Sequence, residues 1–179
     1  MRLAPIVCSA AAIITLSAGT VLLPAASAHA LSLGTLACTG AEQDLYSPAL
    51  TNTASAGDYV TTQDTVGSCL STDTSITGGV GYINSIETGI SCTTLLAAGT
   101  GVTTFIWSNG NYSTFSYDQT TTAVNGELIT TQRGTIIAGE WDGNIAVQVN
   151  ILPTLDLTAC NNGGIFSANG TVAFTILPL

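Results

Sequence analysis

Threonine is frequent in this sequence, and the residues that favour helices are scarce. After residue 30, threonine fills 27 of the 149 positions, whereas the whole sequence has no lysine, two arginines, four glutamates and one methionine. Threonine branches at Cβ and favours extended backbone, whereas long unbranched side chains favour helices. The composition therefore predicts an all-β fold without any helix of three turns.

Alternation of apolar and polar residues locates the strands. It is clearest over residues 144–151 and recurs over residues 171–176. A period of two places the two residue sets on opposite faces of a strand. In the first run we expect one buried face, made of Ile145, Val147, Val149 and Ile151, and one face in water, made of Asn144, Ala146, Gln148 and Asn150.

Weaker alternation and turn signals complete the fold prediction. Further strands are expected at about residues 33–46, 58–66, 75–86, 100–107, 112–122 and 127–138. Hairpin turns are expected at Asn109-Gly110, Asn125-Gly126 and Asp142-Gly143. Seven to nine short strands with frequent glycine turns predict an antiparallel β-sandwich, immunoglobulin-like in a loose sense, and a barrel is the alternative.

The first 30 residues have the features of a secretory signal peptide. Met1-Arg2 is followed by an apolar run, and Ala28-His29-Ala30 is a small-x-small cleavage site. A retained membrane anchor is the alternative for this segment. We predict cleavage of residues 1–30, a single β-sandwich domain over residues 31–179, and a secreted, extracellular product.

Four cysteines remain after the leader, which predicts two disulfides in an oxidising compartment. Three pairings are possible. We favour Cys38–Cys69 with Cys92–Cys160, because a chain reversal near residues 53–54 brings Cys38 opposite Cys69.

Charge and residue usage exclude several function classes. The segment after residue 30 has one arginine and eleven carboxylates, and it has no lysine or histidine. The excess of negative charge argues against nucleic acid and anionic membranes as partners. The missing residue types exclude an imidazole base, a Schiff-base lysine and a histidine-ligated zinc ion, so we expect no cofactor.

The hairpin around Asn109-Gly110 contains the best binding candidates. With a loop of two or four residues, Trp107 lies opposite Tyr112. One face of the hairpin then carries an aromatic strip of Phe105, Trp107 and Tyr112, which could stack on sugar rings or a flat apolar ligand. The alternative is that a loop or the second sheet covers this strip, so that its residues belong to the hydrophobic core. The other face of the hairpin is the expected core surface and carries Val102, Ile106, Phe115 and Tyr117.

Two carboxylates are weaker candidates. Glu140 and Asp142 flank Trp141 beside a predicted turn, where carboxylate oxygens could bind calcium or approach a sugar. Acidic residues in turns are more often simply solvated, and no dense calcium-loop motif is present.

Several segments of the chain carry a resemblance: Cys38-Thr-Gly, Tyr46-Ser47-Pro48, Cys69, Cys92, Gly99-Thr-Gly-Val-Thr-Thr-Phe-Ile-Trp-Ser-Asn-Gly110, Ser113-Thr-Phe-Ser-Tyr117 and Leu152-Pro-Thr-Leu-Asp-Leu-Thr-Ala-Cys160. In these segments the chain resembles a group of small secreted, β-rich, four-cysteine proteins of actinobacteria with no known activity. The resemblance implies export, a β-rich domain and paired cysteines. The chain is also similar to antibiotic-carrying apoproteins of the same bacteria, which have short cysteine loops that it lacks.

The sequence favours a non-enzymatic function. We predict a secreted binding or surface-interaction domain whose partner is a small molecule, a glycan or a protein, with carbohydrate and small apolar molecules as the expected ligand classes. The alternative is a carboxylate-based, glycosidase-like extracellular hydrolase.

Overall fold

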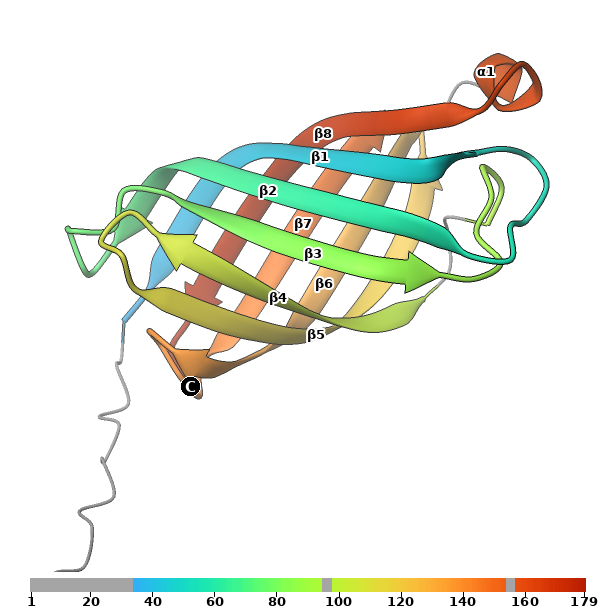
Figure 1. Cartoon of the computed structure of the whole chain (residues 1–179). Coiled ribbons are helices and arrows are strands. Elements are labelled where there is room, and N and C mark those ends of the chain that lie inside the picture. Colours follow the sequence, from blue (N-terminus) through green and yellow to red (C-terminus); the bar gives the residue numbers. More distant parts are fainter. Residues whose placement is uncertain (1–33, 95–97, 154–156) are drawn as a thin grey trace, which may run out of the picture.

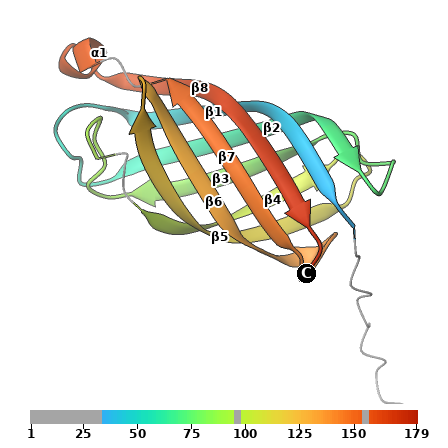
Figure 2. The same ribbon diagram turned by 180° about the vertical axis from the view of Figure 1, so that it is seen from behind.

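Antiparallel strands make up most of the described chain, which comprises residues 34–94, 98–153 and 157–179 of the computed structural model (Figure 1, Figure 2). The predicted signal peptide, residues 1–30, lies outside these residues. The elements in chain order are β1 (Leu36–Leu50), β2 (Asp58–Ser71), β3 (Gly79–Glu87), β4 (Gly99–Trp107), β5 (Tyr112–Val124), β6 (Glu127–Gly139), β7 (Ile145–Pro153), the short helix α1 (Leu157–Asn161) and β8 (Ile165–Leu177).

The strands form a closed barrel, so the predicted β-sandwich is wrong. Each strand pairs with its neighbours in sequence, and β1 also pairs with β8, for example Cys38 opposite Phe174. This last ladder removes the free edges that would separate two sheets. The all-β composition and the strands are as predicted, but the barrel, which was the alternative, is the architecture.

Glycines allow the barrel wall to bend at two places. A Cβ atom on Gly40 would lie 1.9 Å from the Thr65 carbonyl oxygen, and one on Gly134 would lie 1.9 Å from the Ser116 carbonyl oxygen. Gly40 adjoins a shift in the register between β1 and β2. Only a residue without a side chain permits such close approach of two backbones, and glycine bends of this kind let long strands curl into a barrel.

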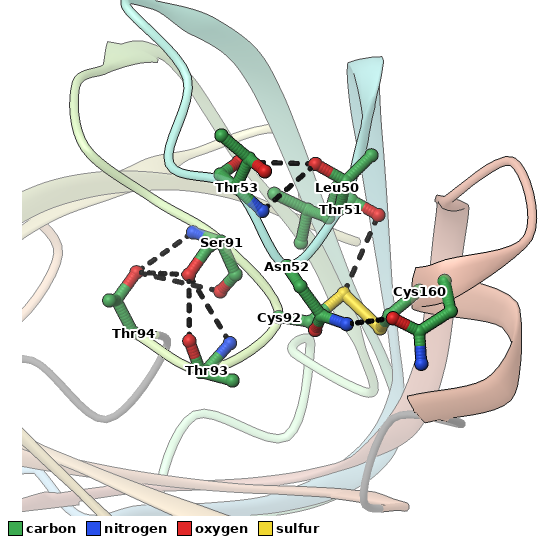
Figure 3. Close-up of a disulfide and its surroundings, with 10 residues drawn as sticks. Leu50, Thr51, Asn52, Thr53, Ser91, Cys92, Thr93, Thr94 and Cys160 are labelled. Atoms are coloured by element: carbon green, nitrogen blue, oxygen red, sulfur yellow. Dashed lines mark hydrogen bonds between the residues drawn. A yellow bond between two sulfur atoms is a disulfide. The ribbon is translucent and has the colours of Figure 1, made fainter.

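The two disulfides are the pair that the sequence predicts. Cys38–Cys69 links β1 to β2 at directly paired positions. Cys92–Cys160 links the connection between β3 and β4 to α1 (Figure 3). Beside it, the Cys92 amide donates to the Thr51 carbonyl oxygen at 2.9 Å, so the disulfide also holds the connection between β1 and β2.

Aromatic side chains fill one end of the barrel, which we call the aromatic end. Phe105 stacks on Trp107 with ring centroids 5.2 Å apart, and Phe174 lies 4.5 Å from Phe105. Trp141 meets Trp107 edge to face at 5.6 Å. An eight-stranded barrel is just wide enough for side chains to fill it, and these rings seal this end.

The register of the β4–β5 hairpin differs by one residue from the prediction. Trp107 pairs with Asn111 around a three-residue loop, and Ile106, rather than Trp107, lies opposite Tyr112. A loop of odd length moves one strand by one position, which reverses the faces of its side chains. Phe105 and Trp107 therefore point into the core, and the predicted strip of Phe105, Trp107 and Tyr112 does not exist as one surface.

The same shift corrects the predicted core face of this hairpin. Phe115 and Tyr117 are buried as expected, but Val102 and Ile106 are about half exposed on the outside.

Alanine substitutions at Trp107 and Tyr112 should have very different effects. Trp107 is 2 % exposed and Tyr112 is 47 % exposed. We expect Trp107→Ala to lower the free energy of unfolding by about 3–5 kcal/mol, as large-to-small core changes do, and Tyr112→Ala to lower it by less than about 1 kcal/mol. Urea unfolding followed by circular dichroism measures both. Equal effects would contradict the observed register.

Strand β7 has its faces reversed relative to the prediction. Its polar set, including Gln148 and Asn150, points into the barrel and is buried, whereas Val147 and Val149 lie half-buried on the outer wall. In β8 the apolar set of Val172, Phe174 and Ile176 is buried as its alternation indicates. The reversal in β7 brings amide groups to the middle of the interior.

Candidate functional site

The half of the interior beyond the aromatic end contains a cavity of about 470 Å³. We call this half the cavity end. It lies toward α1 and the Cys92–Cys160 disulfide. Exposed residues such as Glu87 and Thr100 help to line the cavity, so it reaches the protein surface.

The wall of the cavity is incompletely paired between β3 and β4. Among the described residues, the ladder joins only positions 79–82 to positions 104–107. The later part of β3 and the earlier part of β4 both contribute lining residues, including Ser85 and Val102. The cavity therefore extends to this unpaired stretch of the wall.

Three carboxyl groups lie together at the inner limit of the cavity. Glu42 and Asp44 occupy alternate positions of β1 and point inward, and Asp64 of β2 lies directly opposite Glu42 in the ladder. All three side chains are buried. Two carboxyl groups at directly opposed positions of a sheet repel each other when both are ionised.

A belt of polar side chains holds these carboxyl groups in place. The Asn150 amide donates to Glu42 Oε1 at 2.6 Å, and the Gln148 amide donates to Asp64 Oδ2 at 2.9 Å. The Thr62 hydroxyl donates to Asp44 Oδ1 at 2.5 Å. The carboxyl groups therefore have fixed orientations set by β2 and β7.

Several buried acceptor atoms nevertheless have no hydrogen-bond partner in the described part of the chain. They belong to both the carboxyl groups and the amides, and they are Glu42 Oε2, Asp64 Oδ1, Gln132 Oε1 and Gln148 Oε1. Leaving a buried polar atom unpaired costs about 1–3 kcal/mol. When Glu42 is ionised all four atoms are acceptors, and a proton on Glu42 converts one of them into a donor.

Burial raises the pKa values of the three carboxyl groups. For Glu42, burial and the neighbouring Asp44 and Asp64 raise the pKa to about 9. For Asp64, burial raises the pKa to about 7, and for Asp44 burial also raises the pKa. Desolvation favours the neutral form of an acid, so Glu42 is protonated at neutral pH.

No cation offsets these acids within the described residues. The single cationic side chain there is Arg133, which is exposed on the outer wall of β6 opposite Asp118. The buried carboxyl groups therefore have polar neighbours but no ion-pair partner.

The other predicted site residues lie outside this cavity. Glu140 and Asp142 are in the turn between β6 and β7 at the aromatic end, where Glu140 Oε1 accepts a hydrogen bond from the Asn111 amide. Across residues 34–94, 98–153 and 157–179, no group of three or more histidine, cysteine or acidic side chains is arranged to hold a metal ion. Phe105 and Trp107 belong to the sealed aromatic end, and Tyr112 is on the outer surface.

Sequence reasoning missed Glu42, Asp44 and Asp64. A signal was present, because Glu42 and Asp44 are two residues apart in a predicted strand and therefore share a face. The same spacing recurs at Gln148 and Asn150. In a chain with so few charges, two acids on one strand face were the available indication of a polar interior.

No helix in the described residues is both long and apolar enough to cross a membrane. Comparison of the chain with protein-family models, with curated proteins and with solved structures found no match.

Proposed function

We propose that this protein is a binding domain that takes a small organic molecule into the cavity end of its barrel. The observation that carries the proposal is the cavity of about 470 Å³, which lies within the range of 300–1,000 Å³ typical of ligand sites. Its lining combines apolar side chains such as Val60, Leu128 and Leu152 with many polar ones, among them the oriented groups of Glu42 and Asp44.

The proposed setting is extracellular. The predicted leader directs export, and the two disulfides are stable in an oxidising compartment. A closed barrel with an internal site suits a secreted carrier, because the ligand is shielded from water while the wall stays rigid. A surface-interaction domain for a glycan or a protein would not need this cavity.

A bulky side chain inside the cavity should abolish binding. Thr130 lines the cavity, whereas Thr131, the next residue of β6, lies outside opposite Val149. We expect Thr130→Trp to remove the binding of N-phenyl-1-naphthylamine, a neutral dye that fluoresces in apolar surroundings, and Thr131→Trp to leave it unchanged. Dye titration measures this result. Near-ultraviolet circular dichroism of both variants checks that the barrel is intact.

Dye binding that survives Thr130→Trp, or the absence of dye binding to the parent protein, would overturn the proposed site.

Carboxylate-based hydrolysis is the second candidate. Glu42, with its raised pKa, has the protonation state of a general acid. A glycosidase also needs an ionised carboxylate as its base or nucleophile, and burial raises the pKa of Asp44 and of Asp64 as well. We therefore place binding first. Turnover of glycoside substrates that is lost in both Glu42→Gln and Asp64→Asn would reverse this order.

A further inference from the structure

We propose that the ligand is an amphipathic organic cation whose N–H groups are held by Glu42, Asp44 and Gln132 at the inner limit of the cavity. This inference rests on the proposed binding function and names the chemical class of the ligand.

The first support is the set of buried polar atoms without a hydrogen-bond partner. Glu42 Oε2 and Gln132 Oε1 have no partner among the described residues, and both side chains line the cavity. Glu42 is 5 % exposed and Gln132 is 4 % exposed, so both side chains are almost fully enclosed by the protein. When Glu42 is ionised, a ligand that completes the site must bring donors, and ammonium and guanidinium groups are donors without acceptors.

The second support is that no cation lies beside the buried acids within the described residues. Glu42 and Asp44 line the cavity, and Asp64 on β2 is the ladder partner of Glu42. Buried charges in proteins are normally paired, yet the single described cation, Arg133, is on the outer wall. A ligand cation would provide the missing partner, and a charge-assisted hydrogen bond is roughly twice as strong as a neutral one.

The third support is the order of side chains along the barrel axis. On β2, the inward residue beyond Thr62 toward the cavity end is Val60. On β7, Leu152 follows Asn150 in the same direction, and on β6 Leu128 lies beyond Thr130. On these three strands the wall thus changes from polar to apolar with distance from the carboxyl groups, whereas β5 contributes Gln119 and Thr121 and β3 contributes Ser85 and Glu87 to the outer part of the cavity. A ligand with a charged tip and an apolar body matches the side of the cavity that β2, β6 and β7 form.

The site should couple binding to proton release. Glu42 is protonated in the free protein because of burial and its acidic neighbours, and a bound cation stabilises the ionised form. Affinity should therefore rise with pH up to about 9. The titratable groups around Glu42 are Asp44 and Tyr46 from β1, Asp64 from β2, Glu87 from β3 and Tyr117 from β5. The side chains that β6 and β7 present to it, Gln132 and Asn150, do not titrate.

A pair of nearly isosteric probes tests the inference. Octylguanidinium and octylurea have the same apolar tail and similar planar heads, but only the first is charged. Isothermal titration calorimetry at pH 7, in two buffers with different ionisation heats, measures the affinity and the protons released. We expect octylguanidinium to bind at least about tenfold more tightly and to release protons, and octylurea to release none.

Two variants distinguish binding in the cavity from binding to the acidic outer surface of the barrel. Glu42→Gln keeps the shape and the bond from Asn150 but cannot ionise, so we expect it to weaken octylguanidinium binding by about 10- to 100-fold with little effect on octylurea. Asp118→Asn removes an exposed carboxylate from the outer face of β5 and should change neither affinity.

Each alternative outcome has a distinct meaning. Equal affinities for the two probes, or failure of both while the neutral dye still binds, would overturn the cation inference and leave the binding function standing. Failure of both probes and of the dye would overturn both proposals. A preference for octylguanidinium that is kept in Glu42→Gln and lost in Asp118→Asn would assign the binding to the surface and overturn the inference.

Discussion

The free energy of unfolding should fall steadily as the pH rises from about 4.5 to 9. Burial gives Glu42 a folded-state pKa of about 9 and Asp64 one of about 7, both above the ordinary values of 4.5 and 3.8. Between those limits the folded protein binds more protons than the unfolded chain, so each such carboxyl lowers the stability by up to about 1.4 kcal/mol per pH unit. Urea unfolding at pH 4.5, 7 and 9 measures the trend.

Glu42→Gln provides the matched control for this prediction. The variant has no proton to lose at position 42, so its stability should change less with pH, above all between pH 7 and 9, where Asp64 is largely ionised. Asp118→Asn, on the outer wall, should keep the parent slope. A stability that stays level or rises between pH 5 and 8 in the parent protein would contradict the burial of uncompensated carboxyl groups.

Removal of the Cys92–Cys160 disulfide should cost about 4 kcal/mol of stability. The bond closes a loop of 68 residues. In the chain-entropy model this crosslink lowers the entropy of the unfolded chain, and its removal therefore stabilises the unfolded state by about that amount. We expect the double variant Cys92→Ala/Cys160→Ala to unfold at markedly lower urea concentration and to bind the neutral dye more weakly, because Cys160 and Leu152 pack in the same cluster at the cavity end.

Removal of the other disulfide shows whether a loss of dye affinity comes from the cavity end itself or from lower stability of the whole barrel. Cys38–Cys69 closes a loop of 31 residues and joins strands at the aromatic end. Its double alanine variant should lose a similar amount of stability, about 3–4 kcal/mol, but retain dye affinity under conditions where it is folded. Equal losses of dye affinity in both variants would show that the Cys92–Cys160 disulfide does not shape the cavity.

Strand positions and turns were accessible from sequence because they depend on neighbouring residues. The Asn125-Gly126 turn forms between β5 and β6, with both residues at positive φ, the conformation that such hairpins require. The Asn109-Gly110 turn also forms, but its three-residue loop could not be distinguished from an even-numbered one. That single residue decided whether Trp107 was core or surface.

The candidate site was harder to predict from the sequence, because an alternating pattern separates the two faces of a strand without indicating which face points inward. In β7 the apolar residues looked like the core, yet Gln148 and Asn150 are the buried ones. A sandwich would have buried the apolar face against a second sheet. In a barrel with an internal cavity the inward face can be polar, because it meets other polar groups such as Glu42 and Asp64.

The sequence by itself determined the all-β class, most of the strands and the turns, and it favoured the observed cysteine pairing among three, because β-branched composition, glycine turns and chain reversals act over short distances. Only the tertiary structure decided that β1 closes onto β8, which side of each strand faces inward, and that Glu42 and Asp44 line one cavity with Asp64 paired to Glu42. The physical reason is that closure is a long-range pairing between the two ends of the described chain. The polarity of the interior follows from that closure and is absent from the local pattern of any one strand.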